Sequence, residues 1–104
     1  MAKTESVDCS DREGWTALHK AAANGKADIL RSLLAQGSNV NAQTKNGRTP
    51  LYLAAVDGNE ECVMLLLAND ADPGIKNEEG RAAGEVAKLF NHHAVLELIR
   101  GERK

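Results

Sequence analysis

The sequence predicts an all-α solenoid in which three similar helix pairs stack side by side. A block of residues recurs every 33 positions, and each block holds two short stretches with the apolar spacing of one helix face. The length of 104 residues suits a single domain, and a chain that is 42% hydrophobic and 27% charged is typical of a globular protein. Because aromatic residues make up only 3%, we expect an aliphatic core.

The repeat is clearest in its glycines. Gly14, Gly47 and Gly80 are separated by 33 residues each, and the first two precede similar triplets, Thr16-Ala17-Leu18 and Thr49-Pro50-Leu51. The same register also aligns Ala21-Ala22 with Ala54-Ala55, Gly25 with Gly58, and Leu33-Leu34 with Leu66-Leu67. Matches at so many positions without a gap indicate a true internal repeat.

The first helix of each copy is expected at 17–24 and 50–57. Thr16 and Thr49 stand just before these stretches, where a hydroxyl can accept from the unpaired N–H groups of the first turn. Pro50 suits the first helical position, since its missing N–H is harmless there. A glycine follows each stretch and can take the left-handed conformation that ends helices.

The second helix of each copy is expected at 27–35 and 60–68. Its apolar residues share one helical face, which we expect to be buried; in the first copy they are Ile29, Leu30, Leu33 and Leu34. Helices this short are marginal in isolation, so the pairs must stack to be stable.

These motifs resemble ankyrin repeats, most clearly in Gly47-Arg48-Thr49-Pro50-Leu51 and in the segment from Gly14 to Ala22. The resemblance covers about 11–100 and implies helix-turn-helix pairs joined by short β-hairpin or turn tips. We expect an ankyrin-repeat domain at 11–104, with repeats at 11–43, 44–76 and 77–104. We expect residues 1–10 to be a disordered or extended segment.

The third copy departs most from the pattern. Ala82 replaces the capping threonine and Gly84 the core leucine, so this repeat is predicted to be the weakest. Lys88 and Arg100 place charge where the middle copy has alanine and leucine, as a solvent-facing end requires. The first copy is polar in the same way at Lys20, Arg31 and Ser32. We therefore expect a complete array of three repeats.

The resemblance implies that partners bind to the tips and to the exposed side of each first helix. By position, the tip residues are Arg12, Glu13, Trp15, Lys45, Asn46, Arg48, Glu78, Glu79 and Arg81. The corresponding helix residues are Ala23, Asn24, Val56 and Asp57. Leu89 and Phe90 hold the equivalent places in the third copy, where we favour closure of the terminal helix pair over an apolar binding patch.

Individual side chains allow two interpretations each. Trp15 either anchors a partner or folds back over the edge of the first repeat, and both remain open. For Tyr52 we favour a bridge between repeats that satisfies a backbone group. The resemblance implies that His19 forms a hydrogen bond within its turn. Asn41 is expected to shape a turn, and the resemblance also allows its hydroxylation.

Catalytic, metal-binding and cofactor-binding residues are not predicted. His92 and His93 have no further ligand at zinc-motif spacing, and Cys62, on an apolar face, is interpreted as a small hydrophobic residue. Cys9 and Cys62 are expected to be free thiols. Thirteen basic and fifteen acidic side chains without long like-charge runs argue against nucleic-acid and membrane surfaces. Without an apolar signal stretch in 1–10, we expect a cytoplasmic or nuclear location.

We therefore expect a protein–protein interaction module, acting as an adaptor or regulator, that presents a preformed surface to a protein partner and is monomeric. The alternative is an ankyrin-type inhibitor of a protein kinase or other enzyme. That alternative depends on fold analogy alone.

Overall fold

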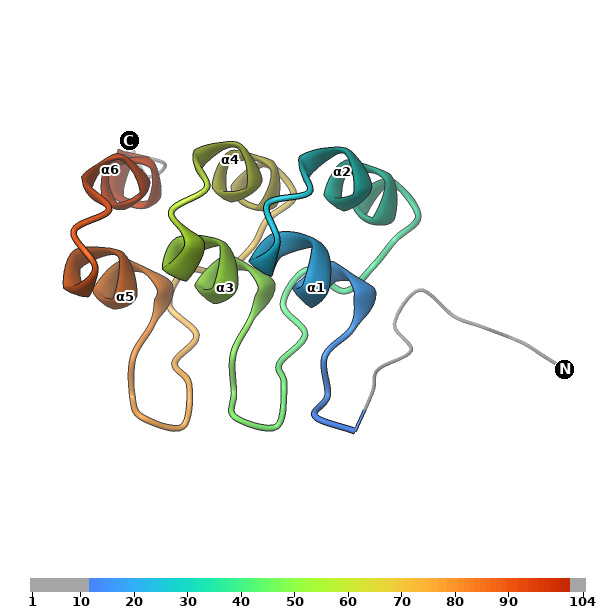
Figure 1. The fold of residues 1–104 in the computed structure, drawn as a ribbon, viewed down its shortest axis with the longest axis horizontal. Helices are drawn as coiled ribbons and strands as arrows, with labels where there is room; N and C mark the ends of the chain where they lie inside the picture. The colour runs from blue at the N-terminus through green and yellow to red at the C-terminus, as the bar shows by residue number, and fades with distance from the viewer. Residues whose placement is uncertain (1–11, 102–104) are drawn as a thin grey trace, which may run out of the picture.

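The computed structural model describes residues 12–101, and within this range the chain forms three helix pairs (Figure 1). The pairs stand in a row, so that α1, α3 and α5 form one layer and α2, α4 and α6 form a second. The helices are α1 (Ala17–Ala23), α2 (Ala27–Ala35), α3 (Pro50–Asp57), α4 (Glu60–Ala68), α5 (Ala83–Leu89) and α6 (His93–Gly101). The predicted all-α solenoid is confirmed, and no helix in the described range is long and apolar enough to cross a membrane.

The helices begin where the capping residues predict. Thr16 Oγ1 accepts from the backbone N–H of His19 at 3.3 Å, and Thr49 Oγ1 accepts from that of Tyr52 at 3.1 Å. Helix α5 lacks a threonine, but Glu85 Oε1 accepts from the backbone N–H of Ala82 at 2.8 Å. This is one half of a capping box, so the third repeat keeps part of the cap that the sequence suggested it had lost.

The core runs through all three pairs. Leu18 and Leu51 are fully buried between the layers, as are Val63 and Leu66 in the second layer. The helix pairs share this core, and each pair therefore depends on its neighbour for burial.

The expected burial of Ile29 is wrong, because its side chain is 53% exposed. The equivalent residues Cys62 and Val95 are 0% and 1% exposed. Helices α4 and α6 each pack against the pair before them, whereas no described helix precedes the first pair. The same repeat position is therefore core in two copies and surface in the other.

Gly84 lies inside α5, where Leu18 and Leu51 lie in the other two copies. A Cβ at this position would meet Ile99 Cγ2 and Leu96 Cδ1 at 3.9 Å, which is ordinary contact. The glycine therefore lowers helix propensity without avoiding a clash.

Gly84→Ala is expected to stabilise the protein by about 1 kcal/mol and raise Tm by roughly 5 °C. Thermal unfolding followed by circular dichroism measures this. Gly37→Ala is the matched control: nothing lies within 4 Å, but φ is +90°, so the same chemical change should lower Tm. A Tm for Gly84→Ala at or below that of the parent chain contradicts the prediction.

Candidate protein-binding surface

The tips that connect the repeats are tight turns. In the second tip the Gly47 N–H donates to Thr44 O at 2.9 Å and the Thr44 N–H donates to Arg48 O at 3.0 Å. Asn77, Gly80 and Arg81 repeat the arrangement in the third tip. The closing glycine has a positive φ in both, 81° at Gly47 and 79° at Gly80. No strand forms between residues 12 and 101, so the tips are turns and not β-hairpins.

Adjacent tips are joined by backbone hydrogen bonds. The Lys45 N–H donates to Glu13 O at 2.9 Å, and the Glu78 N–H donates to Asn46 O at 2.9 Å. The Asn46 side-chain amide also donates to Glu78 Oε2 at 2.9 Å. In Figure 1 the three tips project in the same direction below the first layer. These bonds hold the spacing between tips, so the row is a preformed surface.

His19 connects the first repeat to the second tip. Its side chain is fully buried, Nδ1 accepts from the Thr16 N–H at 3.0 Å, and Nε2 lies 3.0 Å from both Ala42 O and Arg48 O. An Nδ1 that accepts requires the proton on Nε2, which then donates to the two carbonyls. The predicted hydrogen bond within the turn is confirmed, and His19 also orients the next tip.

Tyr52 bridges two repeats as predicted, but it does not bond to the backbone. Its hydroxyl accepts from the Asn77 side-chain amide at 2.9 Å, and Asn77 Oδ1 accepts from the backbone N–H groups of Glu79 and Arg81. The expected backbone partner is wrong because Asn77 stands where the second tip has Thr44, and its amide reaches the phenol. The sequence held a signal for this bond: between equivalent repeat positions, His19 changes to Tyr52 and Thr44 changes to Asn77.

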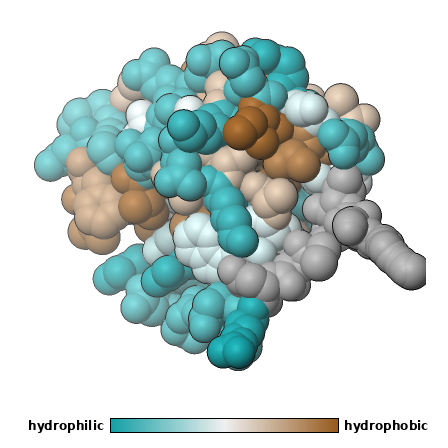
Figure 2. Space-filling view, turned by 45° about the vertical axis from the view of Figure 1, so that its right-hand side comes forward, coloured by the Kyte–Doolittle hydropathy of each residue, from teal (hydrophilic) through white to brown (hydrophobic). Residues whose placement is uncertain are grey.

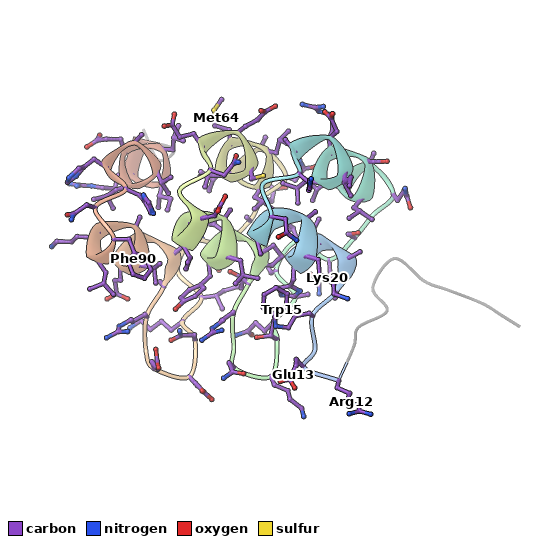
Figure 3. The ribbon with its side chains drawn as sticks, in the orientation of Figure 1. Arg12, Glu13, Trp15, Lys20, Met64 and Phe90 are labelled. Atoms are coloured by element: carbon purple, nitrogen blue, oxygen red, sulfur yellow. The ribbon has the colours of Figure 1, made fainter. Side chains whose placement is uncertain are left out.

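The structure places most of the predicted tip residues on the surface (Figure 3). The exposed residues are Arg12, Glu13, Lys45, Glu78, Glu79 and Arg81, and the partly buried ones are Trp15, Asn46 and Arg48. Trp15 packs against the core, and its ring centroid lies 6.1 Å from that of His19. It therefore covers an edge of the first repeat, and its role as an anchor stays a prediction.

The C-terminal ends of α3 and α5 expose apolar side chains. Val56, Leu89 and Phe90 are 37%, 55% and 49% exposed, and we call these three residues the apolar patch. His92 contacts two of them, since its Nε2 donates to Val56 O at 3.1 Å and its ring lies 6.2 Å from that of Phe90. Figure 2 shows apolar atoms gathered in limited areas of a largely hydrophilic surface.

The expectation that Leu89 and Phe90 close the terminal pair is wrong. Their side chains point away from a core that other residues already fill, namely Val86, Ala87, Val95 and Ile99. The other predicted helix-end positions range from partly buried Ala23 to exposed Asn24 and Asp57.

The groups that could carry chemistry have structural roles. Cys62 is fully buried, and burial raises the pKa of its thiol, with a further increase from the charges of Asp57 and Glu61. The interpretation of Cys62 as a small hydrophobic residue is confirmed, whereas Cys9 lies outside the described residues. Asn41 Oδ1 accepts from the Asp72 N–H at 2.8 Å and so links the turns that follow α2 and α4, which is a contact between repeats. No group of three potential metal ligands occurs in the part of the chain that the structure describes.

Stacked helix pairs with a row of linked tips define a helical repeat protein. A family model described as ankyrin repeats (3 copies) matches residues 2–77, which is more than half of the chain. The chain belongs to the ankyrin-repeat family. Ankyrin repeats generally mediate protein–protein interactions, and the family is typically not enzymatic.

The chain is also similar to parts of much longer proteins. A stretch of 38 residues is 50% identical to BCL-6 corepressor-like protein 1 of Mus musculus and to the protein of that name in Homo sapiens. The stretch covers 36% of this chain and 2% of each relative. The chain therefore corresponds to a small fraction of their length.

Proposed function

We propose that this protein is an adaptor or regulator that holds one protein partner on the tips and the adjacent ends of α1, α3 and α5. The observation that carries the proposal is the apolar patch, which lies on the layer of helices that follows the charged tips. An apolar centre with a polar rim is the usual organisation of a protein interface. The hydrogen bonds between tips support it further, since a preformed surface loses less entropy on binding.

The tips differ in charge along the row. In the first tip Arg12 and Glu13 balance each other, Lys45 and Arg48 make the second tip basic, and Glu78 and Glu79 outnumber Arg81 in the third. The apolar patch belongs to the second and third repeats. A partner with an apolar contact near the third repeat and acidic side chains toward the second tip is therefore complementary to this face.

The double variant Leu89→Ala/Phe90→Ala is expected to weaken partner binding at least tenfold, because it removes half-exposed apolar area from the centre of the proposed interface. The partner is first identified by affinity capture from cytosolic and nuclear extracts. Binding of the purified partner is then measured by isothermal titration calorimetry.

Ile29→Ala/Met64→Ala is the matched control. These side chains are 53% and 55% exposed and belong to α2 and α4 of the second layer. Figure 3 shows Met64 on the side of the molecule away from the tips. This variant removes a similar apolar area and should bind as the parent chain does. Equal loss in both variants, or loss in neither, argues against the tip face as the binding surface.

We also propose that the protein acts as a monomer in the cytoplasm or nucleus. The nuclear extract is included because the relatives are named for corepression. Their shared segment is too short a part of them to carry a partner over to this chain.

A further inference from the structure

An open groove of about 550 Å³ lies at the end of the stack formed by the third helix pair. Gly84, Leu96 and Ile99 form its apolar floor, and Lys88 and Arg100 stand on its rim. These residues belong to α5 and α6, and the tip residues do not contribute. The groove is therefore separate from the proposed tip face.

The groove exists because two repeat positions that are core elsewhere are open here. Gly84 corresponds to Leu18 and Leu51, which are both 0% exposed. Leu96 corresponds to the fully buried Leu30 and Val63 but is only partly buried itself. In the first two pairs this side of the repeat is covered by the next helix pair. The exposed side of the third pair is thus the side that packs against a neighbouring helix pair in the other repeats. It lacks the leucine side chain that Leu18 and Leu51 supply there, because Gly84 takes that position.

The rim of the groove is basic. Lys88 and Arg100 replace the buried Ala55 and Leu67 of the middle repeat, and both are exposed. Neither forms an ion pair with another described residue. The remaining charge, Glu85, is engaged in a 2.8 Å hydrogen bond with the backbone N–H of Ala82. Two cations that no described carboxylate pairs with, beside an apolar floor, favour an acidic occupant.

We propose that this groove is a second docking site that takes an acidic amphipathic helix from a protein partner. An aliphatic side chain of that helix fills the space above Gly84, and its carboxylates pair with Lys88 and Arg100. Occupation of the groove by a second copy of this chain is a competing outcome of the test.

The test titrates the isotope-labelled full chain with a synthetic helix-forming peptide of about 15 residues that carries leucine and glutamate on one face. Amide chemical shifts in heteronuclear NMR spectra report binding. We expect shifts confined to α5, α6 and the other lining residues Gly74 and Ala82, and no shifts with a companion peptide in which lysine replaces every glutamate. Shifts of equal size with both peptides, or shifts centred on the tips, overturn the proposal.

Three variants localise the site. Gly84→Leu fills the groove without changing charge and should weaken binding at least tenfold, while circular dichroism verifies that it is folded. Lys88→Glu/Arg100→Glu should abolish binding of the acidic peptide, whereas Lys20→Glu, at the other end, should leave it unchanged. Unaltered binding by Gly84→Leu overturns the proposal. Sedimentation tests the other occupant. If the chain self-associates as its concentration rises, and Gly84→Leu removes this association, the occupant is a second copy and the proposal is overturned.

Discussion

Leu66→Ala is expected to destabilise the protein by about 3–4 kcal/mol, the largest effect among the substitutions considered. Leu66 is fully buried in α4, which packs against α2, α3 and α6. Removing three carbons there leaves a cavity in the middle of the stack, where neighbours on both sides restrict collapse. The free energy of unfolding of native proteins is about 5–15 kcal/mol, so this substitution removes a large share of it.

Urea unfolding measures this effect through two signals. Circular dichroism reports all six described helices, and the fluorescence of Trp15, the sole tryptophan, reports the first repeat. Both midpoints should fall together, because the terminal repeats depend on the central one. Ile29→Ala, in the equivalent helix of the first pair, is the control and should cost well under 1 kcal/mol. If Leu66→Ala does not fold, Leu66→Val should show a loss of about 1 kcal/mol.

Gly47→Ala is expected to cost about 2–3 kcal/mol by disturbing the contact between the second and third tips. Its φ of +81° disfavours any L side chain by about 1–2 kcal/mol. An added Cβ would also lie 3.0 Å from Asn77 Cα and 3.1 Å from Glu78 N. Both atoms are backbone, so relief requires the tips to separate, which strains the hydrogen bond from the Glu78 N–H to Asn46 O.

Gly80→Ala separates the two causes. Gly80 has nearly the same φ, +79°, but nothing lies within 4 Å of its Cβ position. It should therefore show the conformational cost alone, about 1–2 kcal/mol. Chemical denaturation of both variants gives the difference, and amide exchange at Glu78 should rise only in Gly47→Ala. Equal destabilisation by the two variants would show that the tips are not in tight contact.

Much of the fold could be predicted because helix limits are local. Capping threonines and flanking glycines predicted α3 with the limits that the structure shows and α1 one residue too long. The apolar face of the second helices predicted α2 and α4 with the observed limits. For α5 the sequence predicted a lost cap, because Ala82 replaces the threonine. That prediction was incomplete, since Glu85, inside the helix, accepts from the backbone N–H of Ala82. The positive φ of Asn91, 61°, agrees with its place in the repeat where the other copies have glycine.

The candidate surface was less predictable. The sequence identified the tips by position, but the bonds that align them join residues about 32 positions apart, such as Asn46 and Glu78. The hydrogen bond between Tyr52 and Asn77 joins residues 25 positions apart. The exposure of Phe90 was assigned wrongly, because an apolar residue near a helix end can face either way. Which of the predicted residues touch a partner stays a prediction.

By itself, the sequence determined the repeat, the paired helices and their caps. The repeat is visible as a period of 33 residues, and the caps depend on hydrogen bonds between residues only a few positions apart. Only the tertiary structure decided which face of each repeat is covered. Ile29, Cys62 and Val95 occupy one repeat position yet differ in exposure, because burial depends on whether another helix pair lies alongside. The physical reason is that a repeat supplies only half of each interface, so the ends of the stack and the apolar patch appear only when the pairs are assembled.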